Sequence, residues 1–295
     1  MNSISIMSVL IIFLVSCITS TYALNQFTQT ANQTSITNES NISHLDDRLT
    51  LLSEVLENKI QKAASILETL SIVPEVYKIP FADQINSTLK GIPEDGDIPK
   101  RQIVRNILSN FPDDFVSVLF LMPNGDVYLL EPYTRQKNLT TTNLSFRDYF
   151  NGVLLTNDTF LGDVIISTSS GLKQAQLAVP LFNFGTKNNN NTLDGILSVG
   201  LNFKTYNKIL QSVNLTNHER LIFLDNNGIR IADIAPSKNT VDDSVFRNLQ
   251  SFKSAIMGKS GVINETINGT QIQIHYVPVK AVQKNWALLL LKMQS

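Results

Sequence analysis

The chain has 295 residues, a length that corresponds to about two domains. Apolar residues make up 43% of it, which is enough to bury a hydrophobic core, whereas charged residues make up only 17% and the formal net charge is −1. This composition excludes a wholly disordered chain and the strongly basic surface that nucleic-acid binding requires. We therefore expect a folded protein without a nucleic-acid partner.

Cysteine and histidine are too sparse to form a metal centre. The single cysteine, Cys17, lies in the N-terminal apolar stretch, so the rest of the chain has no disulfide and no cysteine metal site. The three histidines, His44, His218 and His275, are far apart and form no H-x-H or H-E-x-x-H pattern. A nucleophile–base pair and a glycine-rich phosphate loop are also missing from the sequence. The sequence predicts a protein that is not an enzyme and that uses no metal or cofactor.

The N-terminus carries a targeting signal. Residues 4–15 are nearly all apolar, a run of about 12 residues that is too short to span a bilayer but has the length of a signal-peptide core. Three interpretations of residues 1–24 remain open: a signal peptide cleaved after Ala23, a lipoprotein signal with lipidation of Cys17, and an uncleaved anchor. Each places residues 25–295 outside the membrane, as an extracellular or cell-surface chain that is secreted or anchored.

N-glycosylation sequons are unusually frequent. With 30 asparagines in the chain, chance predicts about five N-x-[ST] motifs. The sequence contains eleven, at Asn32, Asn38, Asn41, Asn86, Asn138, Asn143, Asn157, Asn190, Asn214, Asn264 and Asn268. This excess is typical of an exported glycoprotein. Residues 25–44 hold three of the motifs in a stretch rich in Asn, Gln, Ser and Thr, which predicts a stalk without a core.

Residues 45–112 form a helical region. An apolar stripe that includes Leu49, Leu52 and Leu56 repeats at helical spacing from residue 45 to residue 70, and Pro74 marks its end. The stripe fits packing along two domains and equally fits pairing of two helices, so a homodimer through this helix remains open. Pro99 predicts the start of a second helix that extends to about residue 112.

The next 180 residues contain an internal duplication. Strand 115–121, the turn at Asn124-Gly125 and strand 127–130 form one predicted hairpin, and strand 220–224, turn 225–228 and strand 229–232 form another. A helical stretch, a strand pair with a Val-Pro step and a last apolar strand follow each hairpin. A linking helix is expected at 205–213. We therefore predict an α+β fold, in which a long N-terminal helix precedes two modules with antiparallel sheets, residues 113–204 and 205–295.

Several phrases of the first module, in this order and spacing, carry a resemblance to a known family. They are Ser145-Phe146-Arg147-Asp148-Tyr149-Phe150, Leu161-Gly162-Asp163-Val164-Ile165-Ile166-Ser167, Leu177-Ala178-Val179-Pro180 and Gly195-Ile196-Leu197-Ser198-Val199-Gly200. The chain resembles the double Cache (dCache) family of extracellular sensor domains, which are related to PAS domains. This resemblance covers residues 45–292. It implies two PAS-like modules, a membrane-distal one (113–204), which binds the ligand, and a membrane-proximal one (205–295).

The phrase around Arg147 contains the best candidate ligand contacts. Ser145 is a favourable N-cap and Asp148 completes a variant capping box, which would place Arg147 in the first turn of a helix. A guanidinium at such a position can hold a carboxylate through two hydrogen bonds. In the resembled family an arginine two residues before an aromatic residue often holds a carboxylate, which implies ligand contacts for Arg147 and Tyr149, with Phe150 as a wall. Alternatively, Arg147 pairs with a surface carboxylate and Tyr149 belongs to the core.

The sequence departs from the amino-acid-binding members of this family. Those members carry acidic residues that hold the ligand's ammonium group, whereas the corresponding strands here offer Ser167 and Gly200. Because a buried ammonium group without a partner is costly, we expect the pocket to disfavour α-amino acids and to accept a carboxylate or an uncharged metabolite. Asp163 is the nearest acidic candidate, and we include Asp163 and Ser167 among the predicted ligand contacts.

The sequence thus predicts an extracytoplasmic small-molecule-binding sensory module. Because the chain ends at Ser295, directly after the last predicted strand, it would have no cytoplasmic signalling domain of its own. It would then need a membrane receptor or another signalling partner to report ligand binding. The alternative is a glycosylated cell-surface protein with a structural or interaction role that uses the same fold without a ligand.

Overall fold

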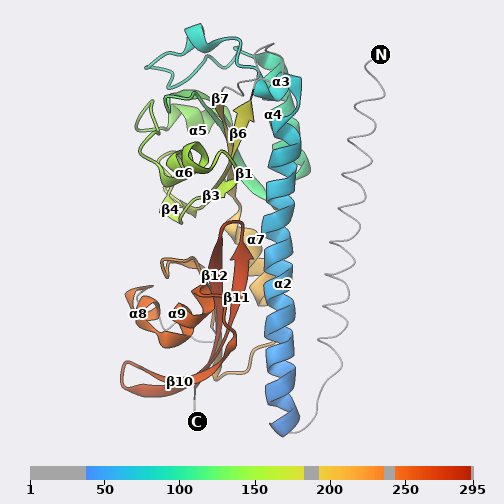
Figure 1. Cartoon of the computed structure of the whole chain (residues 1–295), viewed down its shortest axis with the longest axis vertical. Helices are drawn as coiled ribbons and strands as arrows, with labels where there is room; N and C mark the ends of the chain where they lie inside the picture. The colour runs from blue at the N-terminus through green and yellow to red at the C-terminus, as the bar shows by residue number, and fades with distance from the viewer. Residues whose placement is uncertain (1–37, 183–192, 236–242, 294–295) are drawn as a thin grey trace, which may run out of the picture.

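The computed structural model describes residues 38–182, 193–235 and 243–293. The predicted targeting signal, most of the predicted stalk and the Asn-rich loop at 187–191 lie outside these residues. A single long helix, α2 (Asn38–Ser71), runs beside two modules that are stacked along it (Figure 1). No helix in the described ranges is both long enough and apolar enough to cross a bilayer.

Helix α2 is the element that both modules share. Its predicted apolar stripe is buried, with Leu52, Leu56, Ile60 and Leu67 each at most 1% exposed. The stripe contacts strands of both modules, so the chain itself covers the face that could have paired with a second helix. The helix begins at Asn38 and therefore includes the last seven residues of the predicted stalk.

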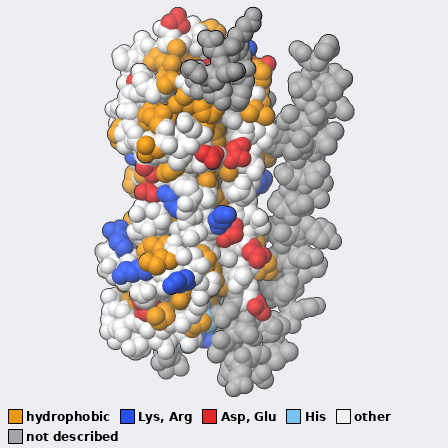
Figure 2. Space-filling view, in the orientation of Figure 1, with side chains coloured by type: hydrophobic (Ala, Val, Ile, Leu, Met, Phe, Trp, Pro, Cys, Tyr) orange, Lys and Arg blue, Asp and Glu red, His pale blue; other side chains and the backbone are white. Residues whose placement is uncertain are grey.

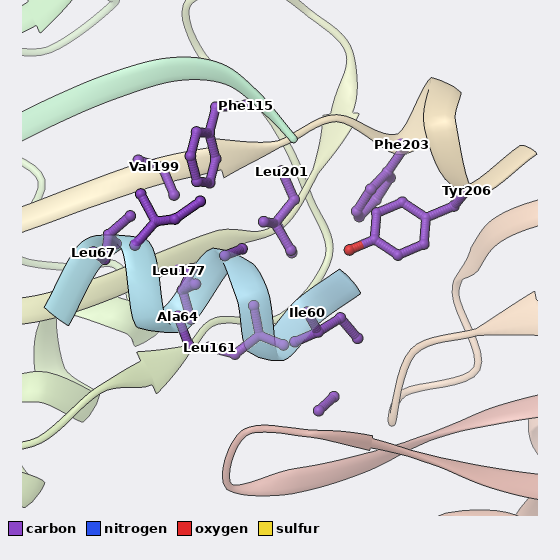
Figure 3. Close-up of a cluster of buried hydrophobic side chains, with 14 of the residues drawn as sticks. Ile60, Ala64, Leu67, Phe115, Leu161, Leu177, Val199, Leu201, Phe203 and Tyr206 are labelled. Carbon is purple, nitrogen blue, oxygen red and sulfur yellow. The ribbon is translucent and has the colours of Figure 1, made fainter. Parts of the chain in front are cut away.

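A continuous core joins α2 to the sheet of the first module and to the linking helix. Figure 3 shows side chains of α2 lying against side chains of the first sheet and of α7. This part of the core contains Ile60, Ala64, Leu67, Phe115, Leu161, Leu177, Val199, Leu201, Phe203 and Tyr206. Burial of this much apolar surface is the main force that holds the long helix against the sheets.

Short helices connect α2 to the first sheet. They are α3 (Pro74–Tyr77), the 3-10 helix η1 (Ala82–Gln84) and α4 (Ile98–Asn110). Pro74 occupies the first position of α3 and Pro99 lies in the first turn of α4, where proline costs no helical hydrogen bond. The Asp97 side chain caps α4 by accepting a hydrogen bond from the Lys100 amide at 3.4 Å. The predicted stop at Pro74 and start at Pro99 are confirmed.

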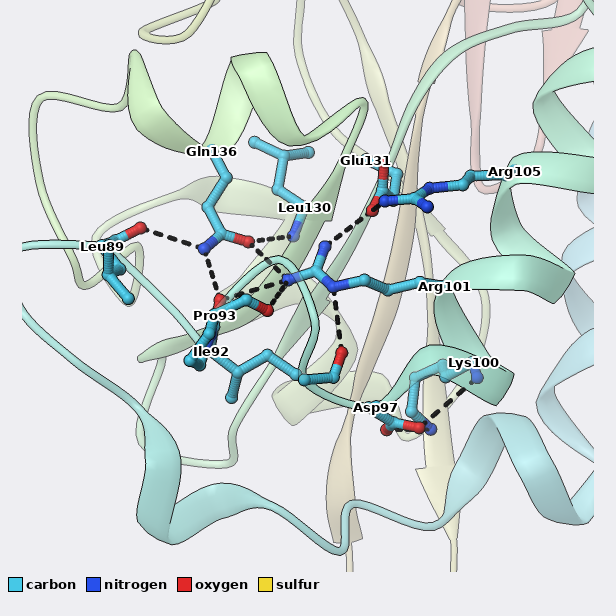
Figure 4. A network of polar contacts seen from close by, with 11 residues as sticks. Leu89, Ile92, Pro93, Asp97, Lys100, Arg101, Arg105, Leu130, Glu131 and Gln136 are labelled. Atoms are coloured by element: carbon cyan, nitrogen blue, oxygen red, sulfur yellow. Dashed lines mark hydrogen bonds and ion pairs between the residues drawn. The ribbon is translucent and has the colours of Figure 1, made fainter.

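A buried ion pair holds α4 against the first module (Figure 4). The Arg101 guanidinium, which is fully buried, lies 2.7 Å from a carboxylate oxygen of Glu131, and Arg101 Nε donates to the Gly96 carbonyl at 3.1 Å. Gln136 accepts a hydrogen bond from the Leu130 amide at 3.1 Å. Because almost all donors and acceptors in this cluster are paired, it fixes the connector in one position.

The first module contains the elements β1 (Phe115–Leu121), β2 (Val127–Glu131), α5 (Tyr133–Lys137), α6 (Asp148–Thr156), β3 (Phe160–Leu161), β4 (Ile165–Ile166), β5 (Lys173–Gln174), β6 (Gln176–Phe182) and β7 (Leu193–Leu201). Its main sheet is antiparallel and has the order β2-β1-β7-β6-β3. Strands β4 and β5 form a separate two-stranded sheet. One face of the main sheet packs on α2, and the other packs on α6.

The second module follows α7 (Phe203–Gln211), the linking helix that the sequence predicts. It contains β8 (Glu219–Leu224), β9 (Arg230–Ile234), α8 (Asp243–Asn248), α9 (Gln250–Ile256), β10 (Gly261–Ile267), β11 (Thr270–Ala281) and β12 (Lys284–Met293). Its sheet order, β9-β8-β12-β11-β10, repeats that of the first module. Both hairpins also carry a bulge at the same place, after Phe120 in β1 and after Phe223 in β8. The predicted α+β fold with two similar antiparallel modules is confirmed.

Candidate ligand-binding site

A small pocket lies on the outer face of the first sheet. It is bounded by strand β1, by the residues at the start of α6, and by the β4–β5 hairpin. Its lining consists of Ser117, Leu119, Leu130, Leu139, Leu144, Arg147, Tyr149, Ile165, Ser167, Thr168, Ser169, Gln174 and Gln176. The set contains one cation, several neutral hydrogen-bonding groups and no carboxylate.

The floor of the pocket is polar because of three residues that lie side by side across the sheet. Gln176 of β6 pairs in register with Gly200 of β7, and Gly200 pairs with Ser117 of β1. A Cβ atom at Gly200 would lie 2.8 Å from the Ser117 hydroxyl and 3.3 Å from the Gln174 amide nitrogen, so the glycine allows these polar groups to lie close to the sheet. Gln176 accepts a hydrogen bond from the Ser198 hydroxyl at 2.9 Å, which fixes its amide group at the pocket floor.

Arg147 lies at the pocket but not within a helical turn. Helix α6 begins at Asp148, and Arg147 is its N-cap residue with extended backbone angles (φ −78, ψ 141). The prediction that Ser145 caps this helix was wrong. The Ser145 amide instead donates to the Asn143 side chain at 2.9 Å, and residues 144–147 form a turn that the Arg147 amide closes by donating to the Leu144 carbonyl at 3.0 Å. The Arg147 guanidinium lies 4.9 Å from the centre of the Phe146 ring and makes no ion pair with any described residue.

Tyr149 and Phe150 follow Arg147 and both belong to the hydrophobic cluster beneath α6, but only Tyr149 also lines the pocket. Tyr149 lines the pocket while its residue surface is only 2% exposed. Burial raises the pKa of the Tyr149 phenol, which therefore stays protonated and can donate a hydrogen bond. Its hydroxyl has no hydrogen-bond partner among the described residues. Phe150 lies in the hydrophobic cluster beneath α6 and does not line the pocket.

The β4–β5 hairpin forms the outer wall of the pocket. Ser167 lines the pocket, and its hydroxyl lies 3.1 Å from that of Ser169. On the other strand, Gln174 accepts a hydrogen bond from Arg135 of α5 at 3.3 Å. The wall therefore presents hydroxyl and amide groups to the interior, and Ser167, one of the predicted ligand contacts, is among them.

Exposed apolar side chains surround the same site. Phe146, Ile166 and Leu172 are 62%, 57% and 58% exposed, and they flank pocket-lining residues in the sequence. Figure 2 shows hydrophobic side chains gathered over the first module. The pocket thus combines a polar interior with apolar surroundings.

Asp163 lies outside the pocket, at the junction of the two modules. Its carboxylate is 2.6 Å from the ammonium group of Lys284, the first residue of β12, and its amide donates to the Asp148 side chain at 2.6 Å. Burial opposes ionisation of Asp163, but hydrogen bonds from Lys284, Asn227 and Asn226 and the charge of Lys284 outweigh it and lower its pKa. The carboxylate is thus ionised and already neutralised by the protein.

Further hydrogen bonds join the modules beside Asp163. The Val164 amide donates to the Asp225 carboxylate at 3.2 Å, and the Leu161 amide donates to the Gln283 side chain at 3.0 Å. Residues 161–164 connect α6 to the β4–β5 wall. The segment that carries one wall of the pocket is therefore fastened to the second module.

Comparison of the whole chain with solved structures identifies this architecture. The extracellular domain of rpHK1S-Z16, which is described as a histidine kinase, is 14% identical, covers 87% of this chain and 95% of its own, and has a TM-score of 0.63. The ligand-binding domain of the Campylobacter jejuni chemoreceptor Tlp3, solved with L-norvaline, is 15% identical, covers 86% and 91%, and has a TM-score of 0.58.

The chain has the double Cache fold. The Pseudomonas aeruginosa PAO1 amino acid chemoreceptor PctC, whose ligand-binding domain was solved with GABA, gives a TM-score of 0.56 at 14% identity and covers 85% of this chain and 98% of its own. No protein-family profile and no curated protein sequence matches the chain. The predicted resemblance to Cache sensors is confirmed, and the fold is one that non-enzymatic receptor domains use.

The free space in the pocket of this Cache module is small. Its volume is ≈ 20 Å³, which holds about one or two water molecules. A ligand of several heavy atoms therefore needs a wider pocket than this one, and the β4–β5 hairpin is one of its walls. This hairpin is the natural element to move, because its two strands pair with each other and not with the main sheet.

Sequence reasoning missed most of the pocket floor. Ser117, Gln174 and Gln176 lie in strands whose sequences suggest only burial. A signal was present in residues 174–178, where Gln174 and Gln176 alternate with apolar residues and so place two amides on one face of a strand. Part of the site was therefore detectable from the period-two pattern alone.

Proposed function

We propose that the chain is an extracytoplasmic sensory module whose first Cache module binds a small carboxylate-bearing ligand that lacks an ammonium group. The observation that carries this proposal is that Arg147 and Tyr149 both line the pocket. The guanidinium has no ion-pair partner among the described residues and the phenol has no hydrogen-bond partner there, so both donors are available to a carboxylate.

The missing acidic group defines the ligand class. The lining contains no Asp or Glu. Of the carboxylates near the lining residues in the sequence, Asp148 accepts a hydrogen bond from the Asp163 amide and Asp163 is paired with Lys284. An α-amino acid would bury its ammonium group against neutral side chains, which is unfavourable. Hydroxyl groups of a ligand, by contrast, would meet Ser117, Ser167 and Gln176. Short monocarboxylates and hydroxycarboxylates therefore suit the pocket better than amino acids.

Binding of a defined ligand panel tests this proposal. Thermal unfolding of the purified chain is measured with acetate, propionate and L-lactate, and separately with glycine, L-alanine and GABA. At a concentration 100 times Kd, a ligand adds about 2.7 kcal/mol of stability, which raises Tm by several degrees. We expect a carboxylate to give this shift and the Arg147→Met variant to abolish it. Selective stabilisation by an amino acid, or a shift that survives in Arg147→Met, would contradict the proposal.

The small pocket volume favours one alternative, a cell-surface protein with a structural or interaction role and no ligand. In that case, no member of either panel would shift the Tm of the chain or of the Arg147→Met variant. Secretion or anchoring through residues 1–24, and a membrane receptor or other signalling partner, belong to the sensory proposal and would be tested by fractionation and crosslinking in the source cells. Pairing of two chains along α2 stays a prediction that light scattering can test.

A further inference from the structure

The sequons fall into two structural groups. Seven of the eleven have described side chains, and six of these are exposed: Asn86, Asn138, Asn157, Asn214, Asn264 and Asn268. The seventh, Asn143, is half-buried in the loop before α6. The two groups differ in what their side-chain nitrogens contact.

The chemistry of N-glycosylation means that the contacts of the side-chain nitrogen decide which asparagines can carry a glycan. A new bond forms between asparagine Nδ2 and carbon C1 of the first sugar, and the bond from C1 to the phosphate oxygen of a lipid-linked oligosaccharide breaks. The lipid phosphate leaves, and one of the two Nδ2 protons passes to a base of the host transferase. An asparagine in the folded protein can carry the glycan only if one Nδ2 hydrogen is not needed elsewhere and there is open space beside it.

Asn143 uses both of its Nδ2 hydrogens. It donates to the Asn124 carbonyl at 3.0 Å and to the Asp126 carboxylate at 2.9 Å, and its Oδ1 accepts from the Ser145 amide. These bonds fasten the loop to the β1–β2 turn, where Gly125 lies so close to Ser145 that a Cβ atom on the glycine would clash. A sugar on Asn143 would replace a hydrogen bond and meet this turn.

The six exposed asparagines do not have this constraint. Asn86 shows the contrast most clearly, because its Oδ1 accepts from the amides of Thr88 and Leu89 at 2.8 and 3.3 Å. Its Nδ2 donates to none of the described residues, so a glycan would leave this turn intact. The side chains at the other five positions likewise make no hydrogen bond within the described part of the chain.

We propose that the six exposed asparagines are the attachment sites of N-linked oligosaccharides in the described part of the chain and that Asn143 remains unmodified. The excess of sequons over chance supplies the expectation of glycosylation, and the side-chain contacts select the sites. Asn264 lies in the middle of β10, an edge strand of the second sheet. A glycan there would also keep this edge from pairing with another chain. The proposal is independent of any ligand in the pocket.

Intact glycopeptide mass spectrometry of the full chain from its source cells tests the assignment. We expect sugar on peptides that contain the exposed sequons and none on the peptide that contains Asn143. Absence of sugar from all six positions, or sugar on Asn143, would overturn the proposal. All six exposed sequons end in threonine, whereas that of Asn143 ends in Ser145. The Ser145→Thr variant removes this difference, and Asn143 should stay bare in it.

Two matched variants separate glycosylation from folding. Asn264→Gln should remove the mass of one glycan and leave Tm within about a degree, because its side chain makes no contact that the fold needs. Asn143→Gln should leave the glycan mass unchanged and lower Tm by several degrees, because it loses the contacts to the β1–β2 turn. The opposite pattern, with glycan loss in Asn143→Gln, would also overturn the assignment.

Discussion

The two modules share one backbone plan but use the outer face of the sheet differently. The common bulge aligns Phe120 with Phe223, so the row Gln176–Gly200–Ser117 of the first sheet corresponds to the row Ile274–Leu291–Arg220 of the second. In the first module this row is the pocket floor. In the second, Ile274 and Leu291 belong to a hydrophobic cluster beneath α8 and α9.

The difference shows how a duplicated fold acquires a binding site. Neither strand order nor register has to change, because small and polar residues at a few positions are enough to leave space and hydrogen-bonding groups. Ser198 of the first sheet similarly corresponds to Leu289 of the second, since they pair with the equivalent residues Leu119 and Ile222. The second module instead gains the stability of a filled core.

The strongest test of this contrast is to give the second module the equivalent of Ser198, the residue that holds Gln176 at the pocket floor. Leu289→Ser should lower the free energy of unfolding by about 4 kcal/mol, because it removes a fully buried side chain and leaves a hydroxyl in an apolar cluster. Urea denaturation measures the loss. The matched change Ser198→Ala in the first module should cost only about 1 kcal/mol, the value of its hydrogen bond to Gln176. Equal losses would refute the contrast.

The modules should also differ in their response to alkaline pH. Burial lowers the pKa of Lys100, beneath the first sheet, to about 8 from 10.5, and the described part of the second module has no buried lysine. Between pH 8 and 10.5 the unfolded chain binds more protons at this site, so stability rises with pH, by up to about 3 kcal/mol. The rise should be absent in Lys100→Met and present in Lys259→Met, an exposed control. If stability fell with rising pH and this fall were absent in Lys100→Met, the prediction that burial lowers the pKa of Lys100 would be wrong.

The arginines at the two outer faces offer a third comparison. Arg220 is nearly buried and donates to Asp233 through two bonds of 2.9 and 2.6 Å, whereas Arg147 has no such partner. Arg220→Met should therefore cost about 2 kcal/mol in chemical denaturation. Arg230, which also pairs with Asp233, limits the loss. A neutral effect of Arg220→Met would show that the pair is not needed for the fold.

The smallest effect is expected at the pocket itself. Arg147→Met should change the free energy of unfolding by less than about 0.5 kcal/mol, because its guanidinium makes no ion pair in the described structure. The same denaturation assay measures it. A loss of 2 kcal/mol or more would assign Arg147 a structural role and remove the main support for a ligand site.

Local signals predicted the fold well because they repeat. Asn124-Gly125 and the turn after Asp225 set two hairpins, and Pro74 and Pro99 set helix boundaries, so each element was readable within a short window. The site was harder. Gly200 and Ser117 become neighbours only through strand register, and Asp163 faces a lysine that is 121 residues away. Helix α6 begins at Asp148 and not directly after Ser145. The Ser145 amide donates to the Asn143 side chain, a contact that capping rules do not include.

The position of helix α2 in the chain constrains the order in which the protein can fold during its synthesis. Its N-terminal half lies beside β11 and β12 (Figure 1), and the Glu57 side chain accepts a hydrogen bond from the Lys280 amide, 223 residues later. Chains leave the ribosome from the N-terminus. The leucine stripe of α2 is therefore synthesised well before β11 and β12, which cover half of it. The second module can therefore pack against α2 only after β11 and β12 have been synthesised, which makes this contact a late step in folding.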